Sequence, residues 1–188
     1  MKRVRTPEYN YNFNESNGYF ERWGKNYLDD PQYSPIGAEI LDLEVSTICH
    51  GGCTHCYKSN VAKGKNMTFK TFKIVFDKMP KTLTQIAFGI GDFYGNPDLP
   101  KMFEYCRKNN VVPNITVHGF DIDENAVNIL AKYCGAVAVS NYGKESCYGT
   151  VKKLTDAGMN QINIHQLLSE ETLILAYKLL KILKQILD

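Results

Sequence analysis

Three cysteines lie close together near residue 50, with three residues between the first two and two residues between the last two: Cys49, Cys53 and Cys56. This spacing lets one short loop bring three thiolates around a compact metal centre, and Gly51 and Gly52 give the loop the backbone freedom it needs. In a cuboidal [4Fe–4S] cluster, three thiolates hold three irons and leave the fourth iron open for a small ligand. The spacing therefore favours an iron–sulfur site.

Zinc is the competing metal, with His50 or His55 as a fourth ligand of a Cys3His site, and unliganded thiols are the third alternative. Zinc is less favoured because structural zinc sites usually join two ligand pairs from separate segments of the chain. The other three cysteines are scattered, and we expect Cys106 and Cys134 to be small buried hydrophobic residues. A disulfide scaffold, which spreads its cysteines along the chain, does not fit this distribution.

The cysteine loop must be positioned by a fold, and from residue 38 the chain alternates strand-like and helix-like patterns five times. We expect Thr68 and Asp123 to be helix N-caps, and we expect helices to end at Pro80 and Gly158. The expected strands are residues 40–45, 83–88, 114–117, 135–140 and 161–165, and the expected helices are 68–79, 100–109, 124–133, about 148–158 and 170 onward, the last capped by Ser169. This alternation predicts an α/β fold with a parallel sheet, either doubly wound or curled into a barrel.

Residues 1–36 are rich in Tyr and Asn without a steady period, so we predict an irregular N-terminal extension followed by a core over residues 37–188. Ligands of parallel α/β sheets bind at the carboxyl ends of the strands. All four histidines of the chain follow an expected strand, including His118 and His165. Asp42 and Glu44 share one face of the first strand, where they either contact a substrate or form a buried hydrogen-bonded pair; the second alternative is favoured.

The Cys-x3-Cys-x2-Cys motif, placed directly after the first strand of a β/α repeat and followed by the aromatic Tyr57, resembles that of the radical S-adenosylmethionine (radical SAM) family. Residues 89–92, Gly-Ile-Gly-Asp, are similar to the Gly-Gly-Glu stretch of the family, with Ile90 between the glycines and Asp92 in place of glutamate. Residues 117–119 stand where many relatives have Thr-Asn-Gly, and residues 139–143 resemble the fourth-strand stretch of the family. The resemblance extends from about residue 40 to the C-terminus.

This resemblance implies a partial (β/α) barrel, of which five units are visible where the family usually has six, and hence a C-terminally truncated member. It implies a radical SAM enzyme that uses a [4Fe–4S] cluster to cleave S-adenosylmethionine (AdoMet) reductively, giving a 5′-deoxyadenosyl radical that abstracts hydrogen from an unidentified substrate, for which peptides and proteins are among the candidates. A truncated, non-catalytic iron–sulfur or zinc-binding relative is the alternative. The electron would come from an external donor such as a flavodoxin or ferredoxin.

The resemblance also assigns binding roles to residues, and it leaves the catalytic residues unknown. Cys49, Cys53 and Cys56 would be the cluster ligands. Tyr57 would lie near the adenine of AdoMet, or else pack under the loop. The other implied contacts to AdoMet are Gly89 and Gly91 at the methionine end, Asp92 on the ammonium group and Ser140 on the ribose or carboxylate. His118 and His165 would either line the pocket or order a loop by hydrogen bonding.

Composition limits the remaining classes. With 22 Lys+Arg against 20 Asp+Glu, the chain gives no signal for nucleic-acid binding. It has no apolar run of about 20 residues that would span a membrane. Six cysteines without an export signal indicate a reducing compartment, so we expect a cytoplasmic protein.

Overall fold

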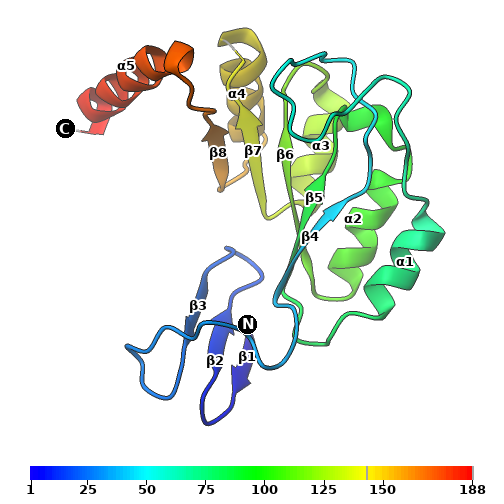
Figure 1. The fold of residues 1–188 in the computed structure, drawn as a ribbon, viewed down its shortest axis with the longest axis vertical. Helices are drawn as coiled ribbons and strands as arrows, with labels where there is room; N and C mark the ends of the chain where they lie inside the picture. Colours follow the sequence, from blue (N-terminus) through cyan, green and yellow to red (C-terminus); the bar gives the residue numbers. More distant parts are fainter. Residues whose placement is uncertain (143, 188) are drawn as a thin grey trace.

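The computed structural model of the chain describes residues 1–142 and 144–187, without the side chains of residues 144, 171, 175, 179 and 182–187 (Figure 1). Its main sheet has five parallel strands in the order β4-β5-β6-β7-β8. The strands are β4 (Ile40–Glu44), β5 (Gln85–Gly89), β6 (Val112–Val117), β7 (Ala136–Ser140) and β8 (Ile162–His165). The helices are α1 (Phe69–Asp77), α2 (Leu99–Lys108), α3 (Glu124–Tyr133), α4 (Gly149–Asp156) and α5 (Glu170–Leu187), with a short 3-10 helix Phe93–Gly95 and a π-helical turn Lys144–Tyr148. The predicted α/β fold with a parallel sheet is confirmed.

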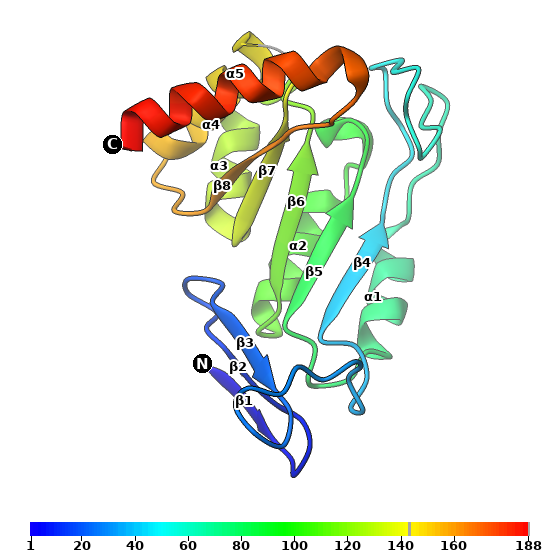
Figure 2. The ribbon, with the colours of Figure 1, turned by 60° about the vertical axis from the view of Figure 1, so that its left-hand side comes forward.

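The order of the strands decides between the two predicted topologies. A doubly wound sheet reverses its strand order at one point, whereas here each strand lies beside the next one in the sequence. With right-handed crossovers, such an order puts all the connecting helices on the same face. Figure 2 shows α1 to α4 together behind the sheet, so the doubly wound alternative is wrong.

The two faces of the main sheet differ in chemistry. The face toward the helices carries apolar side chains in register, such as Leu43, Phe88 and Ile115, and these belong to one buried core. The opposite face, which we call the open face, begins with the apolar Ile40 and Val112 at the amino ends of β4 and β6, and its other residues are polar or small and are exposed or half-buried. Its polar side chains are Asp42, Glu44, Gln85, Asn114, Thr116, Ser140, Asn163 and His165. Parallel sheets are usually covered on both faces, so an uncovered polar face is suited to contact water or a polar ligand.

Local signals explain most of the helix boundaries. The side chain of Thr68 accepts a hydrogen bond from the backbone N–H of Thr71, and Asp123 does the same for Ala126, so both predicted N-caps are confirmed. The α3 helix has the predicted bounds.

Val137 and Val139 of β7 are buried, but Ala138 between them is only half-buried, because no helix of the α1 to α4 layer covers that side.

Residues 1–36 are not irregular, and that prediction is wrong. They contain the strands β1 (Lys2–Arg5), β2 (Asn10–Phe13) and β3 (Phe20–Trp23), which form an antiparallel sheet. Tyr11 and Phe13 are fully buried against Val112, the first residue of β6, and the Tyr11 hydroxyl donates to the Thr82 carbonyl at 2.6 Å. This sheet therefore lies at the amino ends of the main strands, opposite the cysteine loop (Figure 2). The boundary between residues 36 and 37 stays a prediction.

The α5 helix lies on the side of the main sheet away from the other helices, at the level of the carboxyl ends of the strands (Figures 1 and 2). Its predicted cap is confirmed, since Ser169 Oγ accepts from the Thr172 N–H at 3.2 Å. Leu173, Ile174 and Tyr177 are exposed. Within the part of the chain that is described, no helix combines the length and apolarity needed to cross a membrane.

Candidate functional site

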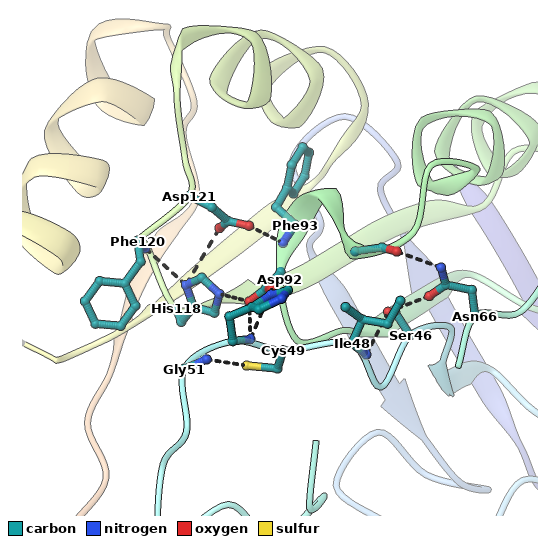
Figure 3. A network of polar contacts seen from close by, with 12 residues as sticks. Ser46, Ile48, Cys49, Gly51, Asn66, Asp92, Phe93, His118, Phe120 and Asp121 are labelled. Carbon is teal, nitrogen blue, oxygen red and sulfur yellow. Dashed lines mark hydrogen bonds and ion pairs between the residues drawn. The ribbon is translucent and has the colours of Figure 1, made fainter. Parts of the chain in front are cut away.

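The cysteine loop is fixed at its base on both sides. The Cys49 N–H donates to the Val61 carbonyl at 3.1 Å, and the Val61 N–H donates to the Thr47 carbonyl at 3.1 Å. The Ser46 hydroxyl donates to Asn66, whose amide donates in turn to the Gly95 carbonyl (Figure 3). The segments before and after the loop are thus joined by hydrogen bonds, which fix the backbone at the base of the loop that carries the thiols.

Gly91 lets the segment after β5 lie against the start of this loop. A Cβ atom on Gly91 would overlap the carbonyl oxygen of Ile48 and lie 2.5 Å from the Cβ of Cys49. The next residue, Asp92, donates its N–H to the same Ile48 carbonyl at 2.8 Å. Glycine is needed here because the backbones of two strand-end loops touch, which places Asp92 beside Cys49.

The three thiols of the motif are all partly exposed, unlike the three other cysteines, which are buried. Burial raises the pKa of the Cys49 thiol, and the nearby Asp92 carboxylate adds to this, although the Gly51 N–H opposes it. The pKa of Cys56 is lowered, mainly by the backbone N–H of Asn60 and further by those of Lys58 and Ser59, against the effect of burial. A lowered pKa favours the thiolate, the form in which a cysteine binds a metal.

Asp92 is the centre of a polar network that joins the ends of three successive strands (Figure 3). Its carboxylate accepts from the His50 N–H at 3.1 Å and contacts His50 Nδ1 at 2.5 Å and His118 Nε2 at 3.0 Å. Burial alone would raise the pKa of Asp92, but the hydrogen bonds from His50 and His118 outweigh it and lower this pKa. Cys49 follows β4, Asp92 follows β5 and His118 follows β6, and their ligand atoms all lie within 4.8 Å of one another.

The lowered pKa of Asp92 predicts a pH-dependent contribution to stability. Because the folded-state pKa lies below the unfolded one, the ionised carboxylate stabilises the fold above about pH 4, and this contribution is lost as the pH falls through the folded-state pKa. We expect Asp92→Asn to lower the unfolding free energy by about 1.5–3 kcal/mol at pH 7, the range for hydrogen bonds to a charged group. Urea denaturation of the unmodified chain and of Asp92→Asn at pH 7, 5 and 3 measures the difference between their unfolding free energies. This difference should narrow only at pH 3. Asp42→Asn, at an exposed carboxylate, controls for the loss of one charge; a difference that stays constant with pH would contradict the prediction.

Tyr142 lies two residues beyond β7, and its ring contacts the cysteine loop at His55. Burial, followed by the Cys53 side chain and the other neighbouring thiols, raises the pKa of Tyr142 to about 12. The ring stacks on Phe120 at 5.7 Å and on His55 at 6.3 Å. An open hollow of about 500 Å³, lined in part by Phe120 and Tyr142, adjoins this stack.

The chain matches no family model and no curated protein, so a functional assignment depends on the contacts within the site itself.

The remaining residues singled out in the sequence are distributed around this site. Tyr57 is 92% exposed, so the alternative that it packs under the loop is wrong. Ser140 and His165 are paired in register at the ends of β7 and β8, and His165 is exposed. His118 does order a loop, since its Nδ1 accepts from the Phe120 N–H at 3.1 Å. Contacts of Tyr57, Ser140 or His165 with AdoMet stay predictions.

Asp42 and Glu44 do not form a buried hydrogen-bonded pair, and that prediction is wrong. Both are exposed on the open face, and Glu44 forms an ion pair with Lys58 at 2.9 Å. The Lys58 ammonium would also lie 2.7 Å from a Cβ on Gly89. Gly89 therefore makes room for a basic residue of the cysteine loop at the open face.

Sequence reasoning missed Tyr142, Lys58 and Asp121 as parts of the site. Tyr142 and Lys58 belong to segments that were already singled out, because they follow β7 and the last motif cysteine. Asp121 lies in the loop after β6, where its carboxylate accepts from the Phe93 N–H at 2.6 Å. Its position after a strand was the available signal.

Proposed function

We propose that this chain is a radical SAM protein in which Cys49, Cys53 and Cys56 hold a [4Fe–4S] cluster. When bound, the cluster would supply the electron that cleaves AdoMet to a 5′-deoxyadenosyl radical, which abstracts hydrogen from the substrate. The five β/α units would be part of the partial barrel of this family. The observation that carries the proposal is the set of three partly exposed thiols on one anchored loop, at the carboxyl edge of a parallel sheet with an open polar face.

The donor set fits such a cluster. A Cβ on Gly51 would lie 3.4 Å from Cys49 Sγ and 3.8 Å from Cys53 Sγ, so both sulfurs border a space that any side chain at residue 51 would fill. Cys53, Cys56 and Cys49 each raise the pKa of Tyr142. Among the described residues the three sulfurs do not all lie within 4.8 Å of one another, so the cluster itself would draw the thiols together around the space beside Gly51.

The residues around the loop have groups that suit AdoMet. Asp92 accepts hydrogen bonds from the His50 backbone N–H with both its oxygens, and the ammonium group of AdoMet, which can only donate, would suit the same carboxylate. The hollow beside Phe120 and Tyr142 has a volume suited to a nucleoside-sized group. His165 and Asn163 project from the exposed positions of β8 on the open face, where a substrate would approach.

The proposal is tested by anaerobic reconstitution with iron and sulfide, reduction with dithionite, and addition of AdoMet. We expect about four irons per chain, visible charge-transfer absorption and the formation of 5′-deoxyadenosine. Binding of AdoMet without 5′-deoxyadenosine would favour the alternative, a non-catalytic iron–sulfur relative. A colourless protein that retains only zinc would refute the cluster.

Two further parts of the proposal concern the surroundings of the protein. The cluster requires a one-electron donor, for which a flavodoxin or ferredoxin is the proposed class. Three thiols that remain reduced and accessible suit a reducing compartment, so we propose a cytoplasmic location. A flavodoxin that replaces dithionite in the assay would support the first of these proposals.

A further inference from the structure

The described residues contain a second possible metal site, which shares only Cys49 with the cysteine motif. We propose that, in the absence of iron and sulfide, the chain binds one zinc-like divalent ion through Cys49 Sγ, the Asp92 carboxylate and His118 Nε2. The three ligand atoms all lie within 4.8 Å of one another, and each residue is partly buried (Figure 3). Cys53 and Cys56 take no part in this site.

Metal binding requires movements of at most about 1.5 Å, because the three ligand atoms are no more than 4.8 Å apart. Tetrahedral zinc, with bonds of about 2.0–2.3 Å, places its ligand atoms about 3.3–3.6 Å apart. His118 Nε2 and Asp92 Oδ1 are 3.0 Å apart and would separate by a few tenths of an ångström. The Cys49 backbone is fixed through the Val61 carbonyl, and Asp92 is fixed through its own N–H to Ile48, so two of the ligands are held before the metal arrives.

The environment of His118 provides the second observation. The Phe120 N–H donates to His118 Nδ1, so in the neutral ring the proton lies on Nε2 and is donated to Asp92. A metal at Nε2 requires this proton to move to Nδ1, and the Phe120 N–H then loses its acceptor and must turn away from the ring. The Oδ1 atom of Asp121 lies 3.7 Å from Nδ1, buried and without a hydrogen-bond partner. Asp121 would then accept from Nδ1 and complete a carboxylate–histidine–metal arrangement, in which the carboxylate fixes the tautomer of the ligating ring.

The donor set selects the class of ion. One sulfur, one nitrogen and one carboxylate oxygen suit zinc and its neighbours in the first transition row, whereas Mg²⁺ and Ca²⁺ prefer oxygen ligands throughout. The Cys49 thiolate and the Asp92 carboxylate carry two negative charges, so a divalent ion leaves the site neutral. Binding releases the thiol proton of Cys49. With three protein ligands, a fourth position remains for water.

The site is tested on the full chain, purified anaerobically without iron and sulfide, by titration with Co²⁺ and by competition of Zn²⁺ against a chromophoric chelator. We expect one equivalent of metal and a thiolate-to-cobalt charge-transfer band. The Cys53→Ala/Cys56→Ala double variant should bind zinc within about threefold of the unmodified chain. Cys49→Ala, Asp92→Asn and His118→Gln should each weaken binding at least as much as the loss of an outer-sphere partner does, about 10–100-fold.

Asp121→Asn tests whether the Asp121 carboxylate orients the ligating His118 ring, because asparagine has the same shape without the charge. It should weaken zinc binding about 10–100-fold, as expected for an outer-sphere partner of a ligating histidine. His55→Ala, at an exposed histidine of the same loop, should leave the affinity unchanged and serves as the control. Thermal melting of each metal-free variant separates a folding defect from a loss of ligands.

Two outcomes would overturn this assignment: no binding by the unmodified chain, or loss of binding in the double cysteine variant while Asp92→Asn still binds, which would assign the metal to the three thiols. The assay contains neither iron nor sulfide, so its failure leaves the proposed cluster untouched. Failure of cluster assembly likewise leaves the zinc assay valid.

Discussion

Gly91→Ala is expected to destabilise the chain and to prevent cluster assembly in the same variant. The added methyl group would overlap the Ile48 carbonyl oxygen and lie 2.5 Å from Cys49 Cβ, and both of these neighbours are backbone or its nearest side-chain atom. They cannot rotate away, so the loop that carries Cys49 must shift. We expect the unfolding free energy to fall by about 3 kcal/mol, the upper part of the range for overpacking. The shift of Cys49 should also reduce the iron bound after reconstitution to the level of a cysteine variant.

Gly149→Ala is the matched control for this experiment. Gly149 lies in α4, and a Cβ there would meet no atom within 4 Å. Alanine is favoured over glycine in a helix by about 0.5–1 kcal/mol, so this variant should be as stable as the unmodified chain or slightly more so. Urea denaturation and iron analysis of both variants check the prediction. Equal stability of the two variants would show that the contact between the loops after β4 and β5 does not constrain the fold.

The core of the fold was predictable because its signals are local and repeated. Thr68 and Asp123 cap their helices as their positions indicated, and the alternation in β4 correctly placed Asp42 and Glu44 on the same face of the strand. Capping depends on three or four adjacent residues, and strand alternation depends on backbone geometry alone. Neither needs knowledge of the tertiary structure.

The N-terminal sheet was missed although its sequence has a signal. Tyr9, Tyr11 and Phe13 alternate with Asn10 and Asn12, and the three aromatic residues are buried. Asn and Tyr suggested an irregular segment by composition, and the strands have only four residues each. Their stability comes from contacts with residues of the core, such as Val112 and Thr82, which are far away in the sequence.

The candidate site was predictable in place but not in its contacts. The strand-end rule put Cys49, Asp92 and His118 at one edge of the sheet. It did not show that Asp92 would bind both His50 and His118, because this depends on the close approach of two loop backbones at Gly91. Since that approach is set by packing between segments about 40 residues apart, no local pattern indicates it.

Cys53→Ala is expected to abolish the iron–sulfur cluster while leaving the fold intact. Cys53 is partly exposed on the loop, so its loss removes a thiolate and little packing. No buried cysteine can replace it: Cys106 and Cys147 are 0% exposed and Cys134 is 6% exposed. Burial also raises the pKa of each of these thiols, to about 12 for Cys106, which keeps them protonated.

The expected result is loss of the visible charge-transfer absorption and of 5′-deoxyadenosine formation, with an unchanged far-UV circular dichroism spectrum. Thr54→Ala, at the adjacent exposed position, should keep both the absorption and the product. If the absorption survives in Cys53→Ala, the assignment of the cluster ligands is wrong. The same variant also separates the two metal sites, because it keeps Cys49, Asp92 and His118. It should therefore bind zinc as the unmodified chain does, since the zinc-like ion is held by residues that follow three different strands and only the cluster needs Cys53.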